Sequence, residues 1–288
     1  MTSLSLILTT GVNSIILSSM YILLALGFAF LFSIMGILNF AHGVIYMVSA
    51  FLCLKFTLLL GLNPWLALLC TLIIVAIFGV LLERFIFRRF YGDMNGTIVA
   101  CLGIIAVLQN SVVITEGYVV EKIPEFARGF MRIGTFSVSW ERMVTLAVGV
   151  GLLILVLLFI NKTKQGLQMQ AIAQDTEGAI FQGISIHGIA ALACIIAFSL
   201  AAVSGSLMGS YLSFSPYMGD NITMKILQIL VLGGIGSING ILYAGLILGT
   251  LDASLPIFVN AAAAQAIVLF VIVIILLFRP KGLFGREV

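Results

Sequence analysis

The stretch "GFAFLFSIMGILNFAHGVIYMVSAFLCL" (27–54) contains no acidic or basic residue apart from His42. It is the last part of a longer run, 1–54, that has no Asp, Glu, Lys or Arg. A helix that crosses the hydrocarbon core of a bilayer needs about 20 predominantly apolar residues. Asn39, His42 and Gly43 interrupt the apolar sequence in the middle of this stretch. We therefore predict two membrane helices separated by a break.

Runs without formal charges recur along the whole chain. Of its 288 residues, 62% are hydrophobic and 9% are charged, whereas soluble domains carry about 25% charged residues. The further runs are 56–82, 94–115, 143–161, 178–219, 226–251 and 253–278. All except 143–161 reach the spanning length, so we predict an all-α polytopic integral membrane protein.

The pattern predicts about eight membrane segments in a single transmembrane domain over 1–288. The expected helices are 12–36, 43–60, 64–82, 97–114, 143–160, 188–209, 223–252 and 259–278. No Lys or Arg precedes the first apolar run and no cleavage site is evident, so the first helix is expected to stay in the mature protein.

Basic residues set the expected orientation. Three arginines lie in "LERFIFRRFYGD" (82–93), and the ending "FRPKGLFGREV" is also basic, which places both in the cytoplasm. By parity, loop 161–187 is cytoplasmic and loop 115–142 is external. A cytoplasmic C-terminus then requires 223–252 to enter the membrane and return, with its turn at "LGGIGSING" (232–240).

Two interrupted segments, "ILNFAHGVIYMVSAFL" (37–52) and "VLGGIGSINGILYAGLIL" (231–248), share an apolar helix, a Gly-containing break and a small-residue helix. Paired interrupted segments in the two halves of a membrane protein point to a transport site. The alternative for His42 is structural, an imidazole satisfied by a backbone carbonyl or by Asn39. The candidate pathway and gating residues are Asn39, His42, Gly43, Gly233, Gly234, Gly236 and Ser237.

Motifs for catalysis are absent from the sequence. It has no GxxxxGK[ST] phosphate loop, no HExxH and no GxSxG, and its two histidines do not make a metal site. The four cysteines lie in apolar segments and are expected to pack as small apolar residues. We expect no enzyme activity, no catalytic residue, no metal or cofactor bound by this chain, and no nucleic-acid partner.

The stretch "KTKQGLQMQAIAQDTEGAIFQGISIHG" (162–188) is too polar to span the membrane. Its apolar positions predict short helices joined near 176–178. The segment combines small residues, an acidic residue in its middle and apolar residues that recur along it. Together they favour an element that docks on a cytoplasmic partner.

The chain resembles the permease subunits of ABC importers for branched-chain amino acids, and in particular the shorter, H-type member of the permease pair. The similar stretches are "ALGFAFLFSIMGILNFAHG" (25–43), "LERFIFRRF" (82–90), "LQNSVVITEG" (108–117), "QGLQMQAIAQDTEGAIFQGI" (165–184), "YMGDNITMKILQILVLGGIGSINGILYAGLILG" (217–249) and "RPKGLFG" (279–285). They run nearly end to end, in the order and spacing of the family.

This resemblance implies a multi-pass protein of the inner (plasma) membrane and four kinds of partner or neighbour. These are a second related permease, two cytoplasmic ATPases that use ATP and Mg²⁺, a periplasmic substrate-binding protein, and membrane lipid. It also implies that 165–184 is the coupling region, with Gly166, Ala171, Gln174, Asp175, Ala179 and Gly183 at matching positions. The chain departs from the family at Leu167 and Gln170, where arginines are common, and this loss removes two charge-assisted docking contacts.

The implied cargo is a branched-chain or related hydrophobic amino acid. Nearly charge-free spans suit a neutral or zwitterionic cargo with an apolar side chain. The helix N-termini near Gly43 and Gly236 would meet a carboxylate on that cargo. The same family also moves urea, short amides and aromatic acids. Two other classes stay open, a passive channel for a small neutral solute and, more remotely, an intramembrane enzyme that uses His42.

Overall fold

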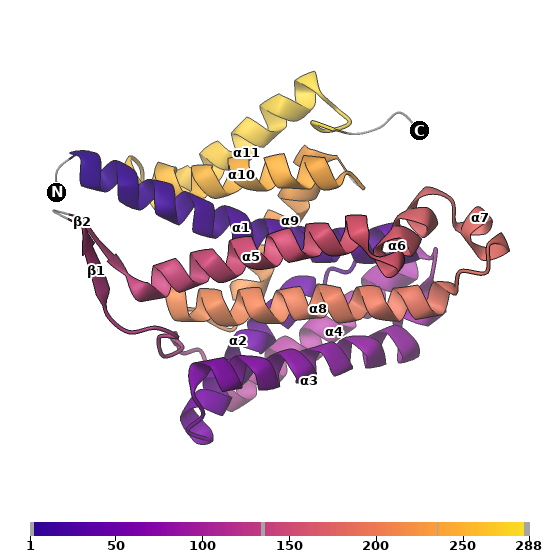
Figure 1. Cartoon of the computed structure of the whole chain (residues 1–288), viewed down its shortest axis with the longest axis horizontal. Coiled ribbons are helices and arrows are strands. Elements are labelled where there is room, and N and C mark those ends of the chain that lie inside the picture. The colour runs from indigo at the N-terminus through magenta and orange to yellow at the C-terminus, as the bar shows by residue number, and fades with distance from the viewer. Residues whose placement is uncertain (1–2, 134–135, 235, 285–288) are drawn as a thin grey trace. The chain divides into compact units, whose positions relative to one another are not determined.

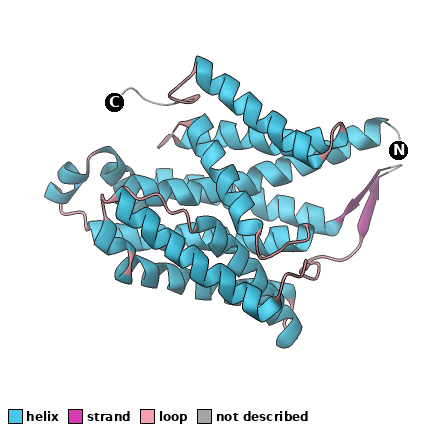
Figure 2. Cartoon of the chain, turned by 180° about the vertical axis from the view of Figure 1, so that it is seen from behind, coloured by secondary structure: helices cyan, strands magenta, loops and turns pink. Residues whose placement is uncertain are grey.

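The computed structural model describes residues 3–133, 136–234 and 236–284. In this part of the chain the regular elements are helices and one antiparallel strand pair (Figures 1 and 2), with an isolated antiparallel bridge between Glu121 and Phe214. The elements are α1 (Ser3–Met35), α2 (His42–Leu59), α3 (Pro64–Phe85), η1 (Phe87–Phe90), α4 (Met94–Glu116), β1 (Phe130–Ile133), β2 (Phe136–Ser139), α5 (Trp140–Lys162), α6 (Lys164–Gln174), α7 (Thr176–Phe181), α8 (Ile186–Tyr211), α9 (Met218–Gly233), α10 (Ile238–Ser254), η2 (Leu255–Ile257) and α11 (Ala261–Phe278).

Among the described residues, 8 helices are long and apolar enough to cross a membrane, which confirms the expected number. They are α1, α2, α3, α4, α5, α8, α10 continued by η2, and α11. The predicted segment 223–252 is two helices, because α9 ends at Gly233 and α10 begins at Ile238. The 16 residues of α9 make it shorter than these spans.

Short polar side chains determine where most of the helices begin. Asn63 accepts a hydrogen bond from the Trp65 backbone N–H, and the intervening Pro64 is suited to the first helical position. The other side-chain caps are Asp93 for α4, Thr163 for α6, Asp175 for α7, Ser185 for α8, Ser237 for α10 and Asn260 for α11. Helix α2 differs, because Ala41 precedes it and no side chain caps it.

The predicted break before α2 is confirmed. After Met35 the chain turns at Gly36, whose φ of 67° favours glycine, and it stays non-helical as far as Ala41. The His42 backbone N–H donates to the Asn39 carbonyl at 3.1 Å. Non-helical backbone is tolerated at membrane depth only where protein or water surrounds it, and Asn39 is fully buried.

The predicted turn at 232–240 is also confirmed. Gly233 at the end of α9 lies so close to Gly240 that an added Cβ would meet the backbone of that residue. Gly234 and Gly236 adopt φ values of 94° and 87°, in the left-handed region that favours glycine. Ile235 lies outside the described residues. Helices α9 and α10 therefore form a hairpin closed by glycine contacts.

The chain forms two compact units, and each is described by itself. The α2–α8 unit contains residues 26–124 and 154–224, and the α10–α11 unit contains the described parts of 1–25, 125–153 and 225–288. Helices α1, α5 and α9 are each divided between the units, with one end of the helix in each unit. The single permease domain expected over 1–288 stays a prediction.

In the α2–α8 unit, helix α8 packs against both α2 and α3 (Figure 1). Small residues permit the close approach, as they do at other membrane helix interfaces. Gly79 of α3 faces the ring of Phe198, and Gly205 of α8 faces the backbone of Tyr46. These contacts hold α2, α3 and α8 together as the core of the unit.

The α10–α11 unit uses a similar device. Gly249 of α10 faces Ser18 of α1, and Gly245, one turn earlier, faces Ile22. The Ser18 hydroxyl lies 3.4 Å from the Leu246 carbonyl, to which it donates a hydrogen bond. The face of α10 that carries Gly245 and Gly249 therefore packs closely against α1 at Ser18 and Ile22.

Gly205→Ala and Gly103→Ala form a matched test of this packing. A Cβ on Gly205 would lie 3.1 Å from the Tyr46 carbonyl carbon and closer still to its oxygen, whereas a Cβ on Gly103 meets nothing within 4 Å. We expect Gly205→Ala to lower the free energy of unfolding by about 1–3 kcal/mol, and Gly103→Ala to leave it unchanged or slightly raised. Thermal unfolding of the purified variants in detergent measures both, and equal midpoints would contradict the prediction.

Candidate functional site

The side chains of Asn39 and His42 are both fully buried in the α2–α8 unit. The His42 ring stacks on Phe198 with centroids 6.2 Å apart and meets the edge of Phe28 at 6.3 Å. Asn39 Oδ1 lies 3.5 Å from the Cys101 thiol, which donates to it, and Asn39 Nδ2 has no hydrogen-bond partner among the described residues. His42 therefore packs among aromatic rings, while the Asn39 amide keeps an unused donor.

Gly43 brings the start of α2 against the first turn of α9. A Cβ at this position would overlap Thr223 Oγ1 and the carbonyl oxygen of Gly219, and it would lie 3.0 Å from Ile222 Cγ2. The Thr223 hydroxyl itself donates to the Gly219 carbonyl at 2.8 Å. Glycine is thus required at position 43 by close backbone approach.

The second predicted group, Gly233 to Ser237, is covered by the C-terminal segment. The backbone N–H groups of Leu283 and Phe284 donate to the carbonyls of Leu232 and Gly233 at 2.8 and 3.1 Å. Ser237 caps α10 by accepting from the Gly240 N–H at 3.1 Å. The chain after α11 thereby satisfies carbonyl groups that the end of α9 leaves without helical partners.

The two predicted groups belong to different compact units. Asn39, His42 and Gly43 lie in the α2–α8 unit, whereas the 233–237 turn lies in the α10–α11 unit. Each group is therefore placed within its own unit, and their joint role in a pathway stays a prediction.

The predicted coupling residues shape two short helices. Gly166 presses against the backbone of Ile160 at the end of α5, and Ala179 is 3% exposed. Asp175 joins the helices and caps α7 by accepting from the Gly178 N–H at 3.0 Å. The joint is thus at Asp175 rather than at the expected 176–178, because the aspartate side chain begins the second helix itself.

The remaining predicted coupling residues differ in exposure. Ala171 is half-buried, Gln174 is exposed, and Gly183 is exposed with a φ of 78° at the turn that ends the segment.

The side chains at the two positions that depart from the family pattern differ in direction and exposure. Gln170 Nε2 donates to the Ile160 carbonyl at 3.0 Å, so this side chain is directed at the end of α5. Leu167 is 54% exposed, and on α7 Ile180 and Phe181 are 50% and 90% exposed. These three exposed side chains are here called the apolar coupling surface. Sequence analysis noted Leu167 as a departure from the family pattern but did not predict this surface.

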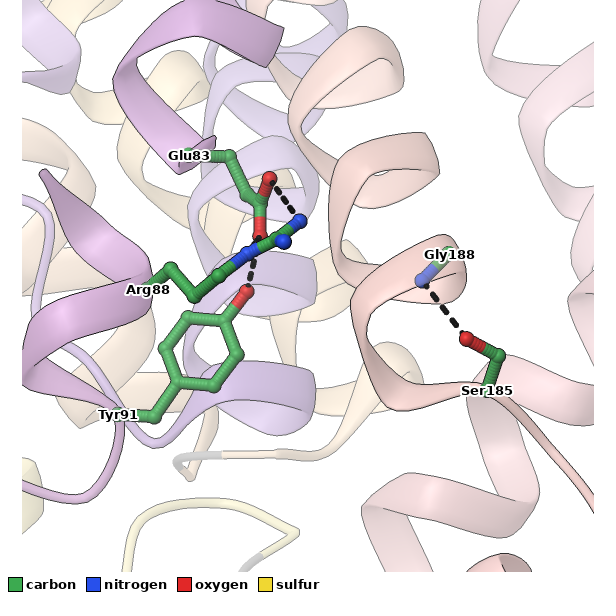
Figure 3. Close-up of polar contacts among 5 residues, drawn as sticks. All are labelled: Glu83, Arg88, Tyr91, Ser185 and Gly188. Carbon is green, nitrogen blue, oxygen red and sulfur yellow. Dashed lines mark hydrogen bonds and ion pairs between the residues drawn. The ribbon is translucent and has the colours of Figure 1, made fainter. Parts of the chain in front are cut away.

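A cluster that the sequence analysis missed lies where α3 meets α4. Glu83 of α3 is fully buried, and its carboxylate accepts two hydrogen bonds from Arg88, from Nε and Nη2, each at 3.0 Å. The Tyr91 hydroxyl donates to the same carboxylate at 2.6 Å. Figure 3 shows the three side chains pointing toward one another, together with the Ser185 cap at the first turn of α8. Sequence analysis used this stretch for orientation and for the family resemblance, and it did not predict the cluster.

A second missed cluster lies in the α10–α11 unit. Lys225 Nζ of α9 lies 2.7 Å from Asp252 Oδ1 of α10, and the two side chains are 15% and 14% exposed. The Tyr21 hydroxyl of α1 donates to Asp252 Oδ2 at 3.0 Å. Charges inside membrane helices are costly unless they are paired. Lys225 and Asp252 are therefore partners across the hairpin rather than separate charges at segment ends.

These features define a polytopic helical membrane protein with interrupted helices and a short helical pair outside its spans. A family model described as "Branched-chain amino acid transport system / permease component" matches residues 11–277. The chain belongs to this family.

Curated relatives agree over nearly the whole length. The chain is 30% identical to LivH of Salmonella typhimurium, named a high-affinity branched-chain amino acid transport system permease protein, over 95% of this chain and 94% of the relative. It is 30% identical to the similarly named BraD of Pseudomonas aeruginosa, over 96% and 94%. It is 26% identical to a probable LivH of Methanocaldococcus jannaschii, over 96% and 91%.

A solved structure shares the fold. PsaBC from Streptococcus pneumoniae in complex with Fab matches with a TM-score of 0.52 at 14% identity, over 92% of this chain and 90% of that chain. The family and this likeness confirm the predicted class, an all-α permease of the ABC transporter type. The chain is a multi-pass permease of the inner membrane.

Lys225→Met tests whether the hairpin depends on its ion pair. Removing one partner of a mostly buried pair leaves the other charge uncompensated, and we expect a loss of about 3 kcal/mol in the free energy of unfolding. The double variant Lys225→Met/Asp252→Leu removes both charges and is expected to regain most of that loss. Denaturation in detergent gives the free energy of unfolding of the wild type, the single variant and the double variant. A double variant no more stable than the single one would contradict a stabilising role for this ion pair.

Proposed function

We propose that this chain is one of the two permease subunits of an ATP-driven importer for branched-chain or related hydrophobic amino acids. Its partners are a related permease, two cytoplasmic ATPases that bind ATP and Mg²⁺, and a periplasmic protein that delivers the substrate. Family membership over residues 11–277 is the observation that carries the proposal. This chain supplies the passage and no catalytic residue.

In this proposal, α6 and α7 receive the energy from an ATPase. The apolar coupling surface supports the assignment, because the large apolar side chain of Phe181 is 90% exposed. Buried apolar anchors supply much of the affinity of protein interfaces. Gly166, Ala171, Gln174, Asp175, Ala179 and Gly183 hold and flank this surface.

Passage is assigned to the two breaks, with Asn39, His42, Gly43, Gly233, Gly234, Gly236 and Ser237 as the pathway and gating residues. The Asn39 amide supports this role, since its Nδ2 donates to no described residue and a buried donor of this kind can bind water or a solute that reaches the break. In the described structure Asn39 is buried, so passage requires a rearrangement of the break. Such rearrangements follow when a partner binds one conformation more tightly than the other.

Co-purification and uptake test the importer together. The tagged chain is expressed with a candidate second permease, candidate ATPases and a candidate binding protein from the same organism. Uptake of labelled leucine is then measured in proteoliposomes. We expect Phe181→Ser to lower ATPase retention roughly tenfold or more, the effect typical of losing an apolar anchor. Phe258→Ser is the matched control, because Phe258 is 80% exposed after η2 and outside the coupling segment.

Two outcomes would overturn this proposal. Leucine flux through the chain alone, without ATP, would identify a passive channel instead. A tagged chain that never retains an ATPase, or that retains it equally in the wild type and in the Phe181→Ser variant, would remove the coupling assignment.

Asn39→Leu separates a pathway role from a packing role. Leucine has a similar size, and replacing a polar group whose donor is unpaired with an apolar one is close to neutral or stabilising. We therefore expect the melting temperature to be kept or raised while ATP-driven uptake falls roughly tenfold. Asn110→Leu, at an exposed position of α4, is the control. Unchanged uptake by Asn39→Leu would show that the residue lies outside the pathway.

A further inference from the structure

We infer that Tyr91 is a positioning residue that makes the α3–α4 connection follow the start of α8 when the coupling segment moves. This inference rests on the proposed function, because it concerns how energy received at α6 and α7 reaches the break at Asn39–Gly43. All of the contacts that carry it lie within the α2–α8 unit.

The first contact joins the coupling segment to Tyr91. Helix α6 contacts α8, and α7 is separated from α8 only by a short turn that ends at the Ser185 cap. His187, in the first turn of α8, lies with its ring centroid 5.8 Å from that of Tyr91 at an interplanar angle of 39°. This separation is within the range of favourable ring contacts. Tyr91 therefore touches the first α8 turn after the coupling segment.

The second contact joins Tyr91 to the transmembrane core. Its hydroxyl donates to the buried Glu83 carboxylate at 2.6 Å, and hydrogen bonds to ionised acceptors are short and strong. Burial, together with the hydrogen bond to Glu83, raises the pKa of the Tyr91 hydroxyl above its usual value, which keeps this donor protonated. The connection between α3 and α4 is thus fixed to a charge inside α3.

The third step leads from α3 to the break before α2. Gly79, one turn before Glu83, packs against the ring of Phe198, and that ring stacks on His42. Packed interfaces of this kind shift as rigid bodies because their side chains interlock. Movement at the start of α8 therefore reaches the break along α8 itself and, through Tyr91 and Glu83, along α3.

The competing explanation is that Tyr91 only stabilises the fold. The chemistry of the cluster separates this explanation from a positioning role. Arg88 already neutralises Glu83 with two hydrogen bonds. The Tyr91 hydroxyl is therefore not needed to pair the buried charge. Tyr91→Phe removes only the link between Glu83 and the ring that contacts His187, and it leaves both the ion pair and the ring contact in place.

The test compares Tyr91→Phe with wild type in the complete importer in proteoliposomes. Leucine uptake and ATP hydrolysis are measured on the same sample, with and without the binding protein. We expect assembly to be kept and the melting temperature to fall by only a few degrees, because Arg88 still pairs Glu83. Leucine moved per ATP hydrolysed is expected to fall roughly tenfold, the order expected for losing a charge-assisted hydrogen bond. Tyr243→Phe is the matched control, because that ring stacks on Phe284 in the other unit.

Each outcome bears on one of the two proposals. An unchanged ratio of uptake to hydrolysis in Tyr91→Phe, in a complex whose wild type transports leucine, overturns the positioning role. Equal falls in assembly, uptake and hydrolysis would also overturn it, since they indicate that Tyr91 only stabilises the fold. A wild-type complex that shows no ATP-driven uptake contradicts the proposed function instead.

Discussion

Hydrocarbon offers no hydrogen-bond partner to a polypeptide, and this constraint governs where the helices of this chain are interrupted. Before α2, the non-helical backbone at Asn39 is enclosed by protein, since that residue has no exposed surface. After α9, the carbonyls of Leu232 and Gly233 accept hydrogen bonds from the C-terminal segment. Both breaks are therefore held by contacts that other parts of the chain supply, and any movement at a break must exchange those contacts.

The same constraint explains the few charges within the helices. Glu83, Lys225 and Asp252 each have an oppositely charged partner at hydrogen-bond distance. A tyrosine hydroxyl also donates to each of the two carboxylates. Breaking either pair would leave a charge in a medium of low dielectric constant, which costs several kcal/mol. The pairs therefore restrict which helices move independently, α3 with its following loop in one unit and α9 with α10 in the other.

The sequence predicts the membrane spans and the breaks but not the ion pairs or the ring contacts, because the latter depend on how distant segments pack. Membrane spans follow from charge-free runs, because the bilayer acts on each segment separately. The breaks at 39–43 and 232–240 are visible because each gathers glycine and polar residues within a few positions of an otherwise apolar run. The Lys225–Asp252 pair joins residues 27 positions apart, so it requires the geometry of the hairpin. Glu83 and Arg88 are close in sequence, yet only packing shows that Glu83 is buried. The individual contacts of His42 likewise depend on rings from α1 and α8.

The departure of Leu167 and Gln170 from the family pattern has different consequences at the two positions. Gln170 donates to the Ile160 carbonyl, so a neutral side chain with N–H donors is sufficient to attach α6 to the end of α5. Leu167 instead adds to the exposed apolar surface with Phe181. Docking through apolar area depends less on salt than docking through ion pairs, because screening weakens only the electrostatic attraction. In the proposed coupling to an ATPase, the absence of the arginines therefore changes the chemistry of the surface that α6 and α7 present, while the helical framework is kept.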